Sequence, residues 1–118
     1  MGSNPTTRAV VKLNKKLKVM KTFNDLEFTP RTFGGVGTHT EINGFVLSVQ
    51  ASESCYCSPR ENYPSQEMYD TFEIAIWKSG GSRKWSTKQF VNVNDDVAAY
   101  LSRTDITEII QKLENYTH

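Results

Sequence analysis

The two cysteines and two histidines of this chain are its best candidates for nucleophilic or metal chemistry. Cys55 and Cys57 are separated by one residue, a spacing that suits a mutual disulfide poorly. His39 and His118 lie far apart in the sequence. A zinc site usually needs four ligands, and two thiolates with two scattered histidines rarely supply them. We therefore expect two free thiols in a reducing cytosol, a surface histidine at position 39, no metal and no cofactor.

Two adjacent carboxylates, Asp95 and Asp96, are the next candidates for chemistry. They could form a general acid–base pair or a cation site. The simpler interpretation is that they begin a turn or short helix at residues 97–101, with Asp96 as its N-cap. The chain has no Gly-x-Ser-x-Gly motif, and a Cys–His site would have to recruit His39 or His118. These patterns favour a binding protein over an enzyme.

A long polar segment at residues 52–68 carries the most suggestive binding residues. A segment of this length without periodicity is usually functional or disordered. Pro59 stiffens the chain next to Arg60, and a guanidinium on a stiff loop is suited to a phosphate. Four aromatic residues offer rings for stacking a base: Tyr56, Tyr63, Trp77 and Trp85. The alternative is that Arg60 pairs with Glu53 or Glu61 and that the tryptophans fill the core or an interface.

The elements that must position these side chains begin with a β-hairpin. Residues 38–42 and 44–51 read as strands joined by Asn43 and Gly44, a strong signal for a two-residue turn. Before it, the glycine-rich stretch at residues 34–37 predicts a turn or a close backbone approach. Pro30 excludes a regular interior strand position just upstream.

The second half of the body predicts further strands and a final helix. Residues 69–77 alternate most clearly, residues 84–91 are expected as their partner strand, and residues 97–101 as a short helix or turn. An apolar stripe at helical spacing predicts a helix at residues 104–115, with Thr104 as N-cap. Strands followed by a helix favour an α+β domain, a small antiparallel β-sheet covered by the C-terminal helix.

Charge divides the chain into an arm and a body. Residues 1–31 hold seven basic and two acidic groups, whereas the remainder holds seven basic and eleven acidic groups. We expect a basic N-terminal arm at residues 1–22, with a short amphipathic segment, and a single ligand-binding domain at residues 23–118. A hydrophobic content of 37% is too high for a disordered chain. No apolar run predicts a secretory signal or a membrane span.

Four stretches of the body together resemble a known family. They are NGFVLSVQAS, CYCSPREN, YDTFEIAIW and DDVAAYLSRTDITEIIQKL, and they lie between residues 23 and 113. In their order they resemble the first type of phage Thoeris anti-defence sponge. The resemblance implies a non-enzymatic protein that binds the cyclic ADP-ribose isomer made by a TIR-domain sensor and holds it intact, so that the effector is not activated.

The resemblance also implies partners and site residues. It implies a homodimer that can assemble into a hexamer in the host bacterial cytosol, with pockets at subunit interfaces. Some family members also take cyclic oligonucleotides, which adds cyclic di- and trinucleotides to the expected ligands; neither a membrane nor DNA is expected. Arg60 would contact phosphate, an aromatic ring would stack on adenine, and Arg103 would supply a second charge. The expected ligand-binding set is Tyr56, Ser58, Arg60, Asn62, Trp77, Trp85, Phe90, Asn92, Asn94, Asp95 and Arg103.

Three rival functions remain open at this point. The first alternative is a small protein–protein inhibitor or adaptor that uses the aromatic loop against a host protein. The second is a nucleic-acid-binding accessory protein that acts through the basic arm. An enzyme acting on a nucleotide is the weakest alternative, because the sequence shows no nucleophile–base pair.

Overall fold

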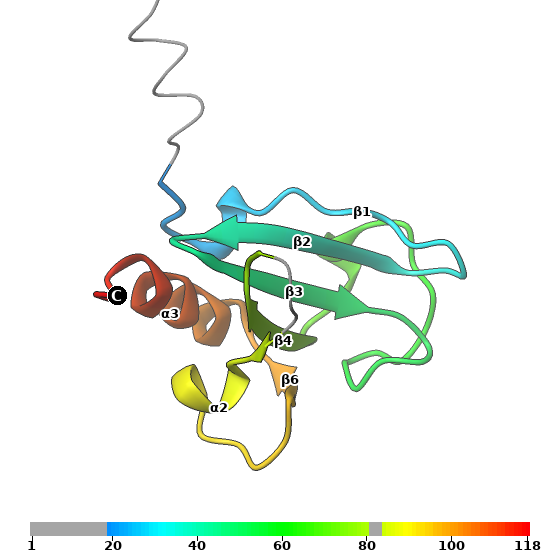
Figure 1. Ribbon diagram of the computed structural model, residues 1–118. Helices are drawn as coiled ribbons and strands as arrows, with labels where there is room; N and C mark the ends of the chain where they lie inside the picture. Colours follow the sequence, from blue (N-terminus) through cyan, green and yellow to red (C-terminus); the bar gives the residue numbers. More distant parts are fainter. Residues whose placement is uncertain (1–18, 81–83) are drawn as a thin grey trace, which may run out of the picture.

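The described residues, 19–80 and 84–118 of a computed structural model, form a twisted antiparallel sheet with one long helix packed against it (Figure 1). The strands are β1 (Thr29–Pro30), β2 (Val36–Ile42), β3 (Phe45–Ala51), β4 (Phe72–Lys78), β5 (Lys84–Trp85) and β6 (Val97–Leu101). The helical elements are η1 (Phe23–Asp25), η2 (Gln66–Met68), α2 (Thr87–Phe90) and α3 (Arg103–Glu114). The α+β class and the covering helix are confirmed.

The central hairpin forms as the sequence predicts. β2 and β3 pair from Ile42–Phe45 outward, and both turn residues have positive φ, 49° at Asn43 and 84° at Gly44. Positive φ at both positions defines a type I′ turn, whose twist matches that of the two strands. The Asn43 side chain donates hydrogen bonds to the backbone oxygens of Leu113 and Tyr116, at 2.8 and 2.9 Å. The turn is therefore fastened to the end of α3.

The core lies between one face of the sheet and α3. Alternation along β3 and β4 turns one set of apolar side chains toward the helix, and all of them are buried: Phe45, Leu47, Val49, Phe72, Ile74 and Ile76. The helix contributes its predicted stripe, also buried: Ile106, Ile109, Ile110 and Leu113. The prediction of Thr104 as the N-cap is wrong, because the helix begins one residue earlier, at Arg103. Ser102 caps the helix in a reciprocal capping box with Asp105, because its hydroxyl accepts the Asp105 N–H.

The predicted partner strand at residues 84–91 is wrong beyond its first two residues. The chain leaves the sheet after Trp85 and forms the short helix α2. The Thr87 hydroxyl accepts the Ile76 N–H at 2.9 Å and donates to the Asp96 carbonyl at 2.6 Å, which draws the chain inward. Phe90 then packs in the core instead of standing on a strand.

The expected helix or turn at residues 97–101 is also wrong, because β6 forms there. β5 pairs only with Trp77 and Lys78, so the rest of that β4 edge accepts β6. The register runs from Ala98 opposite Ile74 to Leu101 opposite Phe72, so two residues of β6, Ala99 and Tyr100, oppose Glu73 alone. This is a β-bulge, and Tyr100 within it has a φ of 56°. Asp96 caps no helix.

Only the last residues of the expected basic arm fall within the described ranges. Residues 1–18, including most of the amphipathic pattern, lie outside them. The Met20 N–H donates to the Glu114 carboxylate at 2.8 Å, and Thr22 caps η1. Residues 19–22 therefore belong to the body. No helix within the described ranges is both long and apolar enough to cross a bilayer.

Candidate functional site

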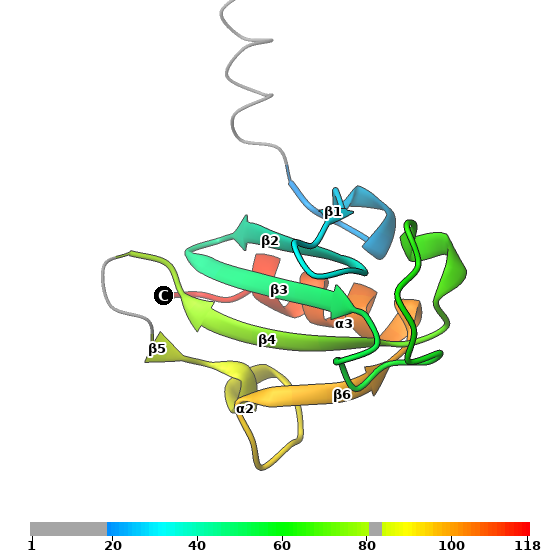
Figure 2. The same cartoon turned by 90° about the vertical axis from the view of Figure 1, so that its right-hand side faces the viewer.

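The face of the sheet that α3 does not cover, here called the open face, carries the polar and aromatic side chains of the strands. Figure 2 shows α3 behind the sheet, so that this face is turned to the viewer. Gly37, Gln50 and Glu73 lie in register across β2, β3 and β4 and form a polar row. Two residues further along each strand, His39, Ser48 and Ala75 form a second row.

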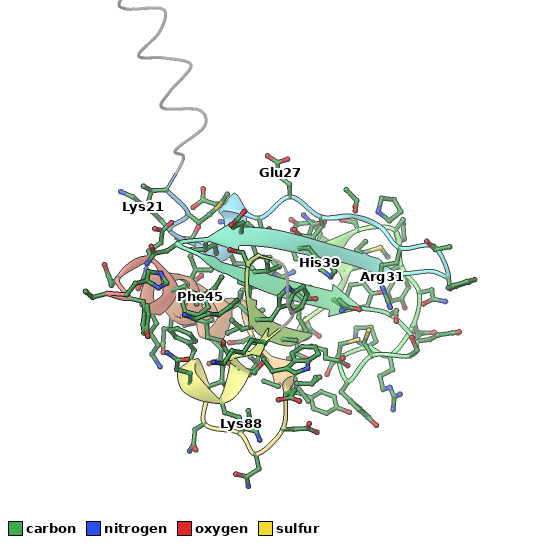
Figure 3. The ribbon with its side chains drawn as sticks, viewed as in Figure 1. Lys21, Glu27, Arg31, His39, Phe45 and Lys88 are labelled. Carbon is green, nitrogen blue, oxygen red and sulfur yellow. The ribbon has the colours of Figure 1, made fainter. Side chains whose placement is uncertain are left out.

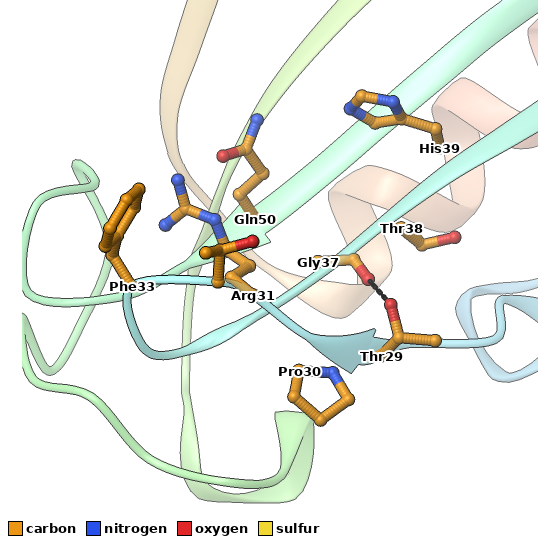
Figure 4. A pocket seen from close by; sticks show the side chains of 9 residues that line it. Thr29, Pro30, Arg31, Phe33, Gly37, Thr38, His39 and Gln50 are labelled. Atoms are coloured by element: carbon orange, nitrogen blue, oxygen red, sulfur yellow. Dashed lines mark hydrogen bonds between the residues drawn. The ribbon is translucent and has the colours of Figure 1, made fainter.

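A cleft of about 600 Å³ opens beside the polar row, between the segment at residues 29–33 and β2. Its volume lies within the range of small-molecule sites, roughly 300–1,000 Å³. Figure 4 shows Arg31, Phe33, His39 and Gln50 among its lining residues. The cleft therefore combines one guanidinium, one amide, one imidazole and one aromatic ring.

Close backbone packing places Arg31 in this cleft. Gly35 has a φ of 79°, and a Cβ there would stand 2.2 Å from the Ala51 carbonyl oxygen. This confirms the close approach predicted for the glycine-rich stretch. The Arg31 N–H donates to the Gly35 carbonyl at 3.0 Å, and the Arg31 side chain runs beside Gly37, where a Cβ would be 3.5 Å from its Cδ.

Among residues 19–80 and 84–118, the Arg31 guanidinium is held through Nη1. Its Nη1 donates to the Ser52 Oγ at 2.7 Å and contacts the Cys55 Sγ at 3.3 Å. A guanidinium carries five N–H donors, so these contacts orient the group and leave the donors of Nε and Nη2 for a ligand. Figure 3 shows Arg31 and His39 along the β2 side of the molecule.

The two cysteines serve the loop behind Arg31. Both are free and buried. Burial raises the pKa of the Cys57 thiol above its ordinary value, which favours the protonated form, and its Sγ contacts the Ser52 carbonyl at 3.3 Å. A buried thiol with a raised pKa is a poor nucleophile. Cys55 and Cys57 therefore pack and orient the loop.

Three rings form an aromatic group on the open face. His39 and Trp77 meet edge to face with ring centroids 5.1 Å apart, and Trp77 and Trp85 do so at 5.6 Å. Ser48 and Ala75, in the row between His39 and β6, have small buried side chains. The Trp85 ring is 42% exposed. Rings over a small-residue floor give a planar ligand a surface for stacking.

At the other end of the face, two tyrosines and Arg60 surround Glu73. The Tyr56 N–H donates to the Glu73 carboxylate at 2.7 Å, and the Tyr100 N–H donates to the Tyr56 carbonyl at 3.0 Å. The two tyrosine rings, both about half exposed, lie 6.4 Å apart. The Arg60 guanidinium lies 5.1 Å from the centre of the Tyr56 ring. We call Tyr56, Arg60, Glu73 and Tyr100 the tyrosine cluster.

Of the eleven residues expected in the site, four lie on the open face or at its rim: Tyr56, Arg60, Trp77 and Trp85. Two others hold the loop together. Ser58 exchanges hydrogen bonds with Thr71, and the Asn62 side chain accepts the Glu53 N–H at 2.9 Å.

The remaining five lie elsewhere. Phe90 was one of three rings, with Trp77 and Trp85, expected to stack on adenine, but it is only 7% exposed and packs against Phe45 and Tyr116 in the core. Arg103 donates to the Gln66 carbonyl at 2.9 Å, with its guanidinium over Phe23 and Phe72. The connection from α2 to β6 contains three exposed residues: Asn92, Asn94 and Asp95. Figure 2 shows that connection beyond the β6 edge, on the opposite side of the sheet from β1.

Sequence reasoning missed six residues of the site: Arg31, Phe33, His39, Gln50, Glu73 and Tyr100. Strand alternation could have identified Gln50 and Glu73, since each is flanked in sequence by buried apolar residues and must point to the other face of the sheet. His39 was expected at the surface but without a role. Tyr100 gave no signal, because the expected helix or turn concealed the bulge.

The fold and site define an α+β domain whose uncovered sheet face carries rings, amides and guanidiniums. No known family model matches the chain, no curated protein is similar to it, and no solved structure matches it. Among residues 19–80 and 84–118, no group of three or more His, Cys, Asp or Glu side chains is placed to hold a metal ion.

Proposed function

We propose that this protein binds a cyclic ADP-ribose-type signalling nucleotide on its open face and sequesters it without cleaving it, as a phage anti-defence protein in the host cytosol. Cyclic di- and trinucleotides are further expected ligands. The proposal joins the resemblance of the sequence to Thoeris sponges with the chemistry of the face. Assembly into a dimer or hexamer and the identity of the signal are part of this proposal.

The observation that carries the proposal is the gathering of two guanidiniums and several rings on one sheet face. Arg31 lines the cleft and Arg60 stands at the rim of the face. A guanidinium matches the oxygens of a phosphate, and a ring face matches a base. Adjacent rows of a strand are about 7 Å apart, since each residue advances about 3.3 Å. The polar row and the aromatic group are thus close enough for one nucleotide to contact both.

A thermal-shift scan tests the proposal. The full chain is heated with each of a panel of cyclic ADP-ribose isomers and cyclic di- and trinucleotides. A ligand present at about 100 times its Kd adds about 2.7 kcal/mol to the free energy of unfolding. For a domain of this size the melting temperature then rises by on the order of 10 °C. Heat-released ligand with unchanged mass and retention time is expected; a converted product would mean an enzyme instead.

Arg60→Ala is the variant with the clearest expectation. Arg60 is exposed, so its loss should weaken nucleotide binding by about tenfold or more while the melting temperature of the free protein stays nearly constant. Lys88→Ala is the matched control, because Lys88 is an exposed cation on α2 and its loss changes the net charge equally. Equal weakening by both variants would mean that Arg60 acts only through the overall charge.

A second candidate, a small inhibitor or adaptor that binds a host protein, is favoured by one observation. Phe33 is 94% exposed at the mouth of the cleft. An exposed aromatic ring of this kind is a common anchor in protein interfaces. If no nucleotide in the panel shifts the melting temperature, this candidate replaces the first.

A further inference from the structure

We propose that Glu73 and Gln50 recognise the vicinal hydroxyl groups of a ribose, so that the open face selects ribonucleotides over their 2′-deoxy counterparts. The inference rests on the proposed function and names the chemical class of ligand that the same face takes. It starts from the position of the Glu73 carboxylate at the end of the face that carries the tyrosine cluster, where a phosphate-binding surface alone has no use for a negative charge.

Glu73 and Gln50 stand opposite each other in the sheet. They pair in register between β4 and β3, so their side chains leave the same face with Cβ atoms about 5 Å apart. Gln50 lines the cleft, and its amide donates to the Ser48 hydroxyl at 3.0 Å. Gln50 and Glu73 are therefore neighbours on the same face, and the side-chain oxygens of both are hydrogen-bond acceptors.

The hydrogen bonds of Glu73 leave it acceptor capacity. One oxygen, Oε1, accepts the Tyr56 N–H at 2.7 Å. An ionised carboxylate offers about four acceptor positions on its two oxygens. Two adjacent hydroxyl groups of a sugar are donors spaced to meet one carboxylate, and an acidic side chain on a ribose hydroxyl is the usual arrangement in dinucleotide sites. A phosphate, in contrast, would be repelled from this position.

The β6 bulge builds the wall of this subsite. It places Tyr100 opposite Glu73 at a φ of 56°, a conformation that a tyrosine rarely adopts. Bulges next to functional sites commonly redirect a side chain, and strained residues persist where the surroundings hold them. Here the Tyr100 N–H donates to the carbonyl of Tyr56, whose own N–H binds Glu73, and the two tyrosine rings lie 6.4 Å apart. Aromatic rings beside a carboxylate can pack against the C–H groups of a sugar while its hydroxyls reach the acid.

Two guanidiniums lie at the rim of the face that carries Glu73. Arg31 and Arg60 approach the face from its two flanking loops. With one carboxylate between them, a phosphate is attracted to the cations at the rim while a ribose lies over the acid. The face would then bind the phosphates of a nucleotide at its arginines and the ribose at its glutamate.

The test measures binding of matched pairs to the full chain by isothermal titration calorimetry. The probes are cyclic ADP-ribose and ADP-ribose, whose riboses carry vicinal hydroxyl groups, each beside its 2′-deoxy counterpart. We expect the ribonucleotide of a pair to bind about 10- to 100-fold more tightly, the range for a hydrogen bond to a charged group. Glu73→Gln should bring the two Kd values of a pair to within about threefold of each other. Because glutamine keeps an acceptor for the Tyr56 N–H, the melting temperature should change little.

Glu41→Gln is the matched control, since Glu41 is an exposed carboxylate on the same face four residues from Gly37 along β2. It should leave the ribose preference unchanged. Equal binding of the two members of a pair by the wild-type chain would overturn this inference alone and leave the proposed function standing. A preference that survives Glu73→Gln would also overturn it. Failure of both ribonucleotides to bind would overturn the proposed function and this inference together.

Discussion

Replacing Tyr100 by glycine and by alanine tests the β-bulge that shapes the tyrosine cluster. Both variants lose the same half-exposed ring, so the difference between them reports the backbone alone. At an ordinary strand position alanine is more stable than glycine by about 0.5–1 kcal/mol, because glycine loses more conformational entropy on folding. At a φ of 56° a Cβ costs about 1–2 kcal/mol. The two effects oppose each other, and the strain is larger. The expected difference lies between about 0 and 1.5 kcal/mol, and Tyr100→Gly should be more stable than Tyr100→Ala by roughly 0.75 kcal/mol.

Denaturant unfolding at equilibrium measures this difference, and the neighbouring residue supplies the control. Ala99 lies in the same bulge but has no positive φ. Ala99→Gly should destabilise the protein by about 0.5–1 kcal/mol, the opposite sign. If the glycine variant is less stable than the alanine variant at both positions, residue 100 does not have a left-handed backbone conformation. The bulge, and the wall of the proposed ribose subsite, would then be wrong.

Three further changes have expected outcomes. Ile109→Ala should lower the free energy of unfolding by about 2–5 kcal/mol in denaturant titrations, because the side chain is buried; a near-zero cost would mean that α3 is not docked. Gly35→Ala should cost about 1–3 kcal/mol more than Gly80→Ala, since both glycines have positive φ but only the first would press a Cβ against Ala51. Burial raises the pKa of Tyr69 above its ordinary value of 10.0, so its contribution to stability is complete below about pH 10 and falls as the pH rises further. Unfolding curves between pH 9 and 11 should thus show a shallower decline for Tyr69→Phe, and an unchanged decline would remove this residue as a cause.

The sequence predicted those parts of the fold that depend on local signals. The Asn43–Gly44 pair strongly favours a type I′ turn. The spacing of Ile106, Ile109, Ile110 and Leu113 is typical of a helix with one buried face. The strand at residues 84–91 was wrong because the Thr87 hydroxyl accepts the Ile76 N–H and donates to the Asp96 carbonyl, and no local pattern encodes these two tertiary hydrogen bonds. The identity of β6 likewise depends on how much of the β4 edge β5 leaves open.

For the site, sequence reasoning found residue types more readily than their positions. Arg60 and Tyr56 lie on one loop, so their proximity was predictable. Arg31 and Gln50 come from segments about 20 residues apart, and they line one cleft because Gly35 lets the chain pass closely over the end of β3. Arg103 has a cation's chemistry but serves the core, as its contacts with two phenylalanines show. A charge in a sequence does not reveal which face of a sheet it will reach.

The fastening of the β2–β3 turn to the end of α3 has a consequence for biosynthesis. The Asn43 side chain binds the Leu113 carbonyl, 70 residues later, and Met20 binds Glu114, 94 residues later. A ribosome adding about 5–20 residues per second needs roughly 4–14 s to pass from Asn43 to Leu113. During that interval the hairpin exists without the helix that covers its apolar face. Chaperones that shield nascent apolar strands should therefore engage this chain after the hairpin emerges and release it once α3 has been made.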